Sequence, residues 1–371
     1  MSPKTISRRD LLAWMADGAL STAFMNIVQG PALAHGDASL AALAAKAGLG
    51  FGTACGGEAL DDPSYSKLIL EQTSILVPEN ALKFDSLRPD EASFAFDKAD
   101  ALLAFADRNG LALRGHTLIW NDWQPDWLKK APHGKIPNLL EGHIEKVMSH
   151  YAGRLQSWDV VNEPFWPGRD APGSYRPGPW YNAMGPEYIF RAFARAAEVD
   201  PKAKLVLNEA WTERSDPLGV AIRKALLQLI DRMRDKGLRI DAIGLQSHLD
   251  PAASYDDASF VDFLHALEAR SLDIYITEFD IDDRSFPDSF AARDRLVAER
   301  AYSFLHHVLS VKAVRLVLCW GLADAYTWWR DPSVMQAHKL RRLSRPLPFS
   351  DDYRGKPMRD AIARAFAERK A

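Results

Sequence analysis

Eight short apolar runs, separated by stretches with helical spacing, constrain the fold of this 371-residue chain more than any other feature. The runs lie between residues 49 and 320 and read LGFGTAC, SILVPEN, LALRGH, SWDVVNE, AKLVLNE, DAIGLQSH, LDIYITE and AVRLVLCW. Because these runs are continuously apolar rather than alternating, they are typical of parallel strands buried on both faces. Eight such strands in series, with helices between them, predict an α/β protein with a single (β/α)8 TIM barrel.

The segments between the runs carry helical signals. Apolar residues recur at helical spacing over residues 222–233, and Gly237 follows as a stop signal. Similar patterns predict a helix over residues 100–110 and a last helix over residues 358–366. No linker rich in Ser, Thr or Pro divides the chain, so we expect one barrel domain over residues 41–371.

Residues 1–34 look like an export signal rather than part of the fold. Arg8 and Arg9 resemble a twin-arginine signal, and a mildly apolar run follows that ends in an Ala-x-Ala pattern at Ala34. A membrane anchor is the alternative, but Asp17 would then lie in mid-span at a cost of about 2.5–3.5 kcal/mol. We therefore expect cleavage after Ala34 and export to the periplasm or beyond, with no membrane attachment of the mature chain.

The overall charge argues against polyanionic partners. Lys and Arg number 46 against 49 Asp and Glu, which gives a net charge of −3, so no basic surface for nucleic acid or anionic lipid is indicated. The chain also holds 11 Trp and 10 Tyr, whose rings suit the apolar faces of sugars as well as they suit a core. A neutral partner fits better, and we expect a monomer.

Cys55 and Cys319 are the two cysteines of the chain, near the ends of the first and last predicted strands. These strands are neighbours in a closed barrel, so a disulfide is conceivable. Because a twin-arginine substrate folds in the reducing cytoplasm, two buried free thiols are favoured. Neither cysteine has the spacing of a metal site, and no cofactor or metal is expected.

Polar residues follow most of the predicted strands. In a βα barrel the carboxyl ends of the strands meet at one face, so these residues should line a single pocket. Polar residues often end strands because loops are exposed to solvent. This explains one or two of them but not a series along the chain. The residues in question are Glu79, Asn80, His116, Asn162, Glu163, Asn208, Glu209, Gln246, His248, Glu278 and Trp320.

Glu163 and Glu278 form the pair that carries chemistry. Cleavage of a glycosidic bond needs one carboxyl group that donates a proton to the leaving oxygen and one carboxylate that attacks the anomeric carbon. Both glutamates end apolar runs and should point into the barrel mouth. Either one alone could serve an ordinary salt bridge. A separation of about 5–5.5 Å would indicate double displacement with retention of configuration.

Six sequence motifs together resemble those of a known protein family. They are VPENALKF, RGHTLIW, WDVVNEP, GLQSHLD, ITEFD and WGLADAYTWW, in this order along the chain. Over essentially the whole of residues 41–371 the chain resembles glycoside hydrolase family 10, the endo-β-1,4-xylanases. The resemblance implies that Glu163 is the acid/base, that Glu278 is the nucleophile and that xylan or xylo-oligosaccharide is the substrate.

The resemblance also implies roles for the residues around this pair. Asn162 would lie beside the sugar's 2-hydroxyl, and His248 and Asn208 near the catalytic carboxylates. His248, two residues past Gln246 on the same predicted strand, could donate a hydrogen bond that keeps Glu278 ionised. The residues implied around the non-reducing side of the cut are Glu79, Asn80, Lys83, His116, Trp120, Gln246, Trp320 and Trp328.

The chain departs from the family pattern at three places. Residues 121–124 read NDWQ where a His-Ser-Gln type run is usual, and residues 209–211 read EAW where an Asp-Tyr pair is common. Phe84 stands where Trp is frequent, a change that mostly affects packing. The reaction type should be retained, while the preference for decorated or short xylo-oligomers stays open.

Two alternatives to an endo-β-1,4-xylanase follow from the same residues. Another retaining β-glycanase of the same barrel class, such as a mannanase or a cellulase, would share the Asn-Glu-Pro run and the strand-end glutamate. A non-catalytic carbohydrate-binding barrel would be expected if one glutamate had been lost. Both Glu163 and Glu278 are present, which favours the enzyme.

Overall fold

The computed structural model describes residues 38–168 and 171–369, so the predicted export signal lies outside the described residues. Within these ranges eight parallel strands close into a barrel, because β10 pairs with both β9 and β1. These strands are β1 (Gly50–Cys55), β2 (Ile75–Pro78), β3 (Ala112–Gly115), β5 (Ser157–Asn162), β6 (Lys204–Glu209), β7 (Ala242–Leu245), β9 (Asp273–Ile281) and β10 (Val314–Cys319). The predicted (β/α)8 TIM barrel is confirmed.

Two short strands, β4 (Ile119–Trp120) and β8 (His248–Leu249), extend the barrel at its carboxyl end by pairing with β5 and β9. The prediction that Gln246 and His248 share one strand is wrong. Ser247 between them has a φ of 61°, in the left-handed region where an extended strand cannot continue. His248 therefore belongs to β8, beside Asp280 of β9.

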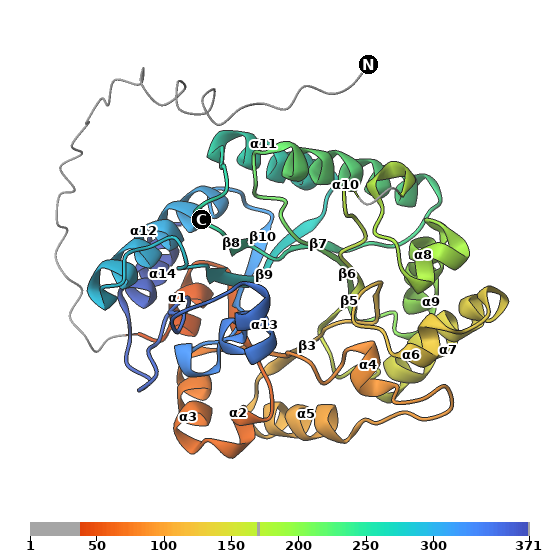
Figure 1. The fold of residues 1–371 in the computed structure, drawn as a ribbon, viewed down its shortest axis with the longest axis horizontal. Coiled ribbons are helices and arrows are strands. Elements are labelled where there is room, and N and C mark those ends of the chain that lie inside the picture. Colours follow the sequence, from red (N-terminus) through yellow and green to blue (C-terminus); the bar gives the residue numbers. More distant parts are fainter. Residues whose placement is uncertain (1–37, 169–170, 370–371) are drawn as a thin grey trace. The chain divides into compact units, whose positions relative to one another are not determined.

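Helices surround the strands as a ring (Figure 1). One longer helix separates each strand from the next along the barrel, and α14 follows the last strand. In chain order the helices are α1 (Leu40–Lys46), α2 (Glu58–Asp61), α3 (Pro63–Gln72), α4 (Phe84–Leu87), α5 (Asp97–Asn109), α6 (Asp126–Lys129), α7 (Ile136–His150), α8 (Pro179–Met184), α9 (Glu187–Val199), α10 (Pro217–Asp235), α11 (Asp257–Glu268), α12 (Phe290–Val308), α13 (Pro332–Ala337) and α14 (Pro357–Glu368).

The three helices predicted from sequence are confirmed as α5, α10 and α14. Gly110 and Gly237 follow α5 and α10 with φ values of 68° and 69°, which glycine adopts without the steric cost that other residues meet. None of the described helices is long and apolar enough to cross a membrane.

Apolar side chains fill the barrel from inside and cover it from outside. The inner cluster includes Val77, Val206, Tyr275 and Leu316, while a larger cluster joins the outer strand faces to the helices. The buried Arg114 lies over the Tyr275 ring at 5.3 Å, so its charge is also enclosed by the barrel. A buried charge of this kind needs a partner of opposite charge.

That partner is Asp159 of β5, whose Oδ1 accepts a hydrogen bond from Arg114 Nη2 at 2.5 Å. Its other oxygen lies 3.0 Å from Nδ1 of His116, and all three side chains are buried. Gly115 lets β3 approach β5 closely, since a Cβ atom there would lie 2.0 Å from the Trp158 ring. The buried pair thus fixes the orientation of His116 at the mouth of the barrel.

Candidate active site

The carboxyl ends of the strands surround a cavity of about 340 Å³. Ten of the residues predicted for the site line it together, although they come from widely separated parts of the chain. They are Lys83, His116, Trp120, Asn162, Glu163, Gln246, His248, Glu278, Trp320 and Trp328. The convergence expected from a closed barrel therefore brings both candidate carboxylates into one cavity.

The other three predicted residues lie around this cavity rather than along its wall. Asn208 is fully buried beneath it, at the end of β6. Asn80 is exposed, and its side-chain oxygen accepts a hydrogen bond from Lys83 at 2.9 Å. Glu79 is half-buried after β2, and burial raises the pKa of its carboxyl group despite the nearby charge of Lys83.

Glu278 lies within β9 and is held by two donors. Asn208 Nδ2 donates to Oε1 at 2.7 Å, and His248 Nε2 lies 3.1 Å from Oε2. Burial raises the pKa of Glu278, but the bond from His248, the charges of His116 and His248 and the bond from Asn208 together hold it below its ordinary value. A carboxylate in this setting stays ionised, as a nucleophile must.

His248 lies between two carboxylates. Its Nδ1 is 3.0 Å from Asp280 Oδ1, on the opposite side of the ring from Glu278. Burial lowers the pKa of His248, but the charges and hydrogen bonds of Asp280 and Glu278 raise it to about 10. The imidazole is therefore a cation near neutral pH. Asp280 is itself held by Trp328, whose Nε1 donates to Oδ2 at 2.7 Å.

Glu163 follows β5 with a φ of 47°, an uncommon conformation for glutamate that is often found at functional sites. Gln246 Nε2 donates to its Oε1 at 2.8 Å, and Trp120 Nε1 donates to its Oε2 at 3.2 Å. Arg176 donates to the same Oε2 at 2.5 Å and to the backbone carbonyl of Glu163 at 2.9 Å. The carboxyl group is thus fixed on three sides.

Amide side chains connect the two glutamates. Asn208 Nδ2 donates both to Glu278 and to Asn162 Oδ1, the latter at 2.8 Å, while Thr277 donates to Asn208 Oδ1 at 2.7 Å. Gly244 makes room for this arrangement, because a Cβ atom there would lie 2.2 Å from Asn208 Oδ1. The network holds Asn162 and Glu278 in fixed relative positions.

Several residues of this network were not predicted from the sequence. Asp159 and Asp280 lie inside the motifs WDVVNEP and ITEFD, so their position beside the two glutamates was a usable signal. Arg176 lies in the irregular segment after β5 and outside every motif, so no sequence signal identified it. Glu213 lines the cavity with only 2% of its surface exposed, and burial raises its pKa to about 7.

The three departures from the family pattern occupy different places. Phe84 is buried at the start of α4 and packs against the rings of Trp127, His143 and Trp180, in line with a packing role. Ala210 and Trp211 line the cavity, whereas Glu209 is buried behind it. Burial and the charge of Glu163 raise the pKa of Glu209 well above its ordinary value.

The segment 121–124 lies beside Glu163. Asp122 accepts a hydrogen bond from Arg176, the same guanidinium that holds Glu163. Trp123 lines the cavity, and its ring lies nearly parallel to that of Trp120, with a centroid distance of 6.5 Å. This altered segment therefore contributes to the site. Among the described residues no group of three or more His, Cys, Asp or Glu is placed to hold a metal ion.

A (β/α)8 barrel with two differently held glutamates in one aromatic-lined cavity defines a class, the barrel glycoside hydrolases. The family model described as "Glycosyl hydrolase family 10" matches residues 39–365. The chain belongs to glycosyl hydrolase family 10.

Individual relatives agree with this assignment. "Endo-1,4-beta-xylanase B" of Thermotoga neapolitana is 33% identical over 90% of this chain and 93% of its own length. "Endo-1,4-beta-xylanase A" of Caldicellulosiruptor sp. is 35% identical over 78% of this chain but only 44% of its own length. The crystal structure of xylanase 10B from Thermotoga petrophila RKU-1 in complex with xylobiose matches with a TM-score of 0.80 at 31% identity, over 89% of this chain and 98% of that chain.

Proposed function

We propose that this chain is an endo-1,4-β-xylanase that cuts internal bonds of xylan by double displacement, with retention of anomeric configuration. The observation that carries the proposal is the unlike surroundings of the two glutamates in one cavity. Glu278 is kept ionised by His248 and Asn208, while Glu163 is aimed by three other donors. The xylanase names of the relatives support the choice of substrate.

In the first step Glu278 attacks the anomeric carbon while Glu163 gives its proton to the leaving glycosidic oxygen, which breaks the bond between two sugars. In the second step Glu163 takes a proton from water, and the resulting hydroxide displaces Glu278. Asn162 is assigned a hydrogen bond to the 2-hydroxyl of the attacked sugar. That bond strengthens as positive charge develops on the ring, so it favours the transition state over the ground state.

Hydrolysis of xylan, mannan and cellulose by the mature chain tests the proposal. We expect reducing sugar from xylan, and product whose anomeric configuration matches that of the bond cut, as followed by NMR at early times. Glu278→Gln should abolish turnover. Glu163→Ala should lose most activity on xylan yet retain more on an aryl xylobioside with a good leaving group, because that group departs without a proton.

Glu198→Gln is the matched control, since Glu198 is exposed on α9 and pairs with Arg195 outside the cavity. It should leave all rates unchanged. Release from mannan or cellulose instead of xylan would reassign the substrate within the same barrel class. Full activity of the Glu278→Gln variant would overturn the assignment of the nucleophile.

We also propose that the mature enzyme acts outside the cytoplasm. The twin-arginine-type leader at residues 1–34 supports this proposal. An enzyme that cleaves a polymer such as xylan must also be present where the polymer is found. Sequencing the amino terminus of the exported protein tests the proposal. A mature chain that begins after Ala34 is expected, and one that still carries Arg8 and Arg9 would contradict it.

A further inference from the structure

We infer that Trp123 is a sugar-stacking platform at the rim of the cavity, which binds a xylan residue beyond those next to the cut on the non-reducing side. The inference rests on the proposed function. Trp123 lies in the segment 121–124, which differs from the run described above as usual in the family.

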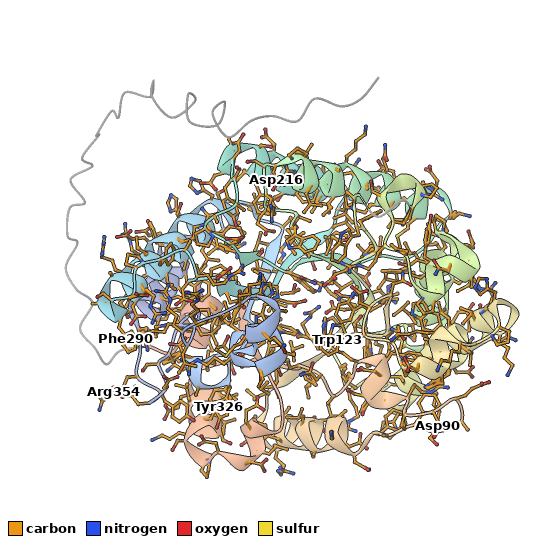
Figure 2. The ribbon with its side chains drawn as sticks, viewed as in Figure 1. Asp90, Trp123, Asp216, Phe290, Tyr326 and Arg354 are labelled. Carbon is orange, nitrogen blue, oxygen red and sulfur yellow. The ribbon has the colours of Figure 1, made fainter. Side chains whose placement is uncertain are left out.

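The exposure of Trp123 is the first observation. Among the described residues Trp123 and Phe290 are the most exposed large apolar side chains, at 63% each. Trp123 lines the cavity, whereas Phe290 begins α12 on the outside of the barrel. In projection Trp123 falls inside the ring of helices and Phe290 at its edge (Figure 2). Apolar surface left exposed beside a binding site is typical of a contact for a ligand.

The rings around Lys83 form the second observation. Lys83 Nζ lies 5.6 Å from the ring centroid of Trp120, 5.7 Å from that of Trp123 and 6.0 Å from that of Trp320. Trp320 is 7% exposed, Trp120 is half-buried and Trp123 is 63% exposed. The three indoles therefore lead from the floor of the cavity to its rim, and Trp123 continues an aromatic surface that already exists.

The backbone of the turn is the third observation. Trp123 has a φ of 50°, a conformation that bulky side chains rarely adopt and that persists only where the surroundings enforce it. Gln124 Nε2 donates to the carbonyls of Trp120 and Asp122, and Arg176 holds the side chain of Asp122. The turn is thus fixed on both sides of a ring that itself projects into solvent.

A fixed, exposed indole suits a sugar ring for a physical reason. The face of a β-linked xylose residue carries C–H groups that pack against an aromatic face, and a platform that is already ordered binds without an entropy cost for its own side chain. Lys83 beside it can donate to the sugar's hydroxyl groups.

The position of the platform follows from its neighbours. Trp120 donates to Glu163, and Lys83 belongs to the residues implied at the non-reducing side of the cut. Trp123 lies next to both and closer to solvent, so its sugar is farther from the scissile bond. Binding at such a distance is equal in the ground state and the transition state, and it should lower KM without changing kcat.

The test compares xylo-oligosaccharides of three to six residues as substrates of the intact mature enzyme and of Trp123→Ala. We expect kcat/KM of the variant to fall by about two- to tenfold on the longest substrates, through KM, and to change little on xylotriose. Trp123→Gly accommodates the positive φ and should show the same loss of kcat/KM. It replaces the alanine variant if that variant folds poorly. Trp123→Phe keeps a ring and should recover most of the loss.

Cleavage positions provide a second readout. The substrate is labelled at its reducing end so that each product identifies the bond that was cut. Without the Trp123 ring, fewer cuts should occur at bonds whose cleavage places a sugar on Trp123. Phe290→Ala, with the same exposure outside the cavity, should change neither readout. Equal loss at every chain length, or no loss at any, would overturn the inference while leaving the xylanase assignment intact. If the unaltered enzyme cleaves no xylo-oligosaccharide, the proposed function fails instead.

Discussion

Replacement of His248 tests the electrostatic part of the mechanism most directly. The structure gives the imidazole a positive charge, because Asp280 and Glu278 raise its pKa to about 10. This cation holds the Glu278 carboxylate from 3.1 Å and helps to keep the pKa of Glu278 below its ordinary value of 4.5. Without the cation, burial dominates, so the pKa of Glu278 should rise.

The size of the effect follows from the contact that is lost. A hydrogen bond to a charged group contributes about 1.5–3 kcal/mol, and 1.36 kcal/mol corresponds to about one pH unit. His248→Ala removes both the charge and the bond and should move the acid limb of kcat/KM upward by about two pH units. His248→Gln can still donate one neutral bond, so a shift of about one pH unit is expected.

The assay is kcat/KM on a xylo-oligosaccharide from pH 3 to pH 9, which reports the ionisation of the free enzyme. His265→Gln is the control, because His265 pairs with Glu268 on the exposed face of α11. It should leave the profile unchanged. An acid limb that stays in place in both His248 variants, or that moves to lower pH, would refute the role given to the imidazolium.

Three further outcomes can be checked independently. Glu213→Gln should gain stability relative to the unaltered chain. The gain should grow as the pH rises from 4.5 to 7 and reach about 3 kcal/mol above pH 7, because burial raises the pKa of Glu213 to about 7 while the unfolded chain already releases that proton near pH 4.5. Denaturant titrations at pH 5 and pH 8 measure this difference, and an equal difference at both pH values would contradict it. Gly244→Ala should lower kcat on the order of a hundredfold while circular dichroism shows a folded barrel, because the added Cβ displaces Asn208. Unchanged kcat would show that Asn208 tolerates the shift. Cys55 and Cys319 are buried free thiols whose pKa values burial raises, so a thiol reagent should react with them only after unfolding; rapid reaction of the native enzyme would contradict this burial.

The fold could be predicted from the sequence because its signal is local and repeated. Continuous apolar runs require burial on both faces, and eight of them in series leave few arrangements other than a closed barrel. Once the barrel is assumed, the carboxyl ends of its strands must converge. Glu163 and Glu278 could therefore be placed in one cavity although 115 residues separate them in the sequence.

The residues that the sequence did not identify act through tertiary contacts. Arg176 reaches Glu163 from an irregular segment after β5, and no spacing rule relates a loop residue to the carboxylate it will contact. The break at Ser247 is a second example, because an extended strand and a strand with one left-handed residue have the same apolar pattern. Asp280 is an intermediate case. Its place in the motif ITEFD, two residues after Glu278, could be read from the sequence, but its contact with His248 could not.

The buried hydrogen-bond network and the exposed Trp123 differ in how much a substitution would disturb. Asn208, Glu278 and Thr277 are buried and joined by hydrogen bonds, so a change in one leaves another polar group unpaired at a cost of about 1–3 kcal/mol. The Trp123 ring is 63% exposed and has Lys83 and Trp120 beside it, neither of which is fully buried, so its replacement should disturb the buried network little. A change in the buried network should therefore affect the reaction itself, whereas a change at Trp123 should affect only the binding of longer substrates.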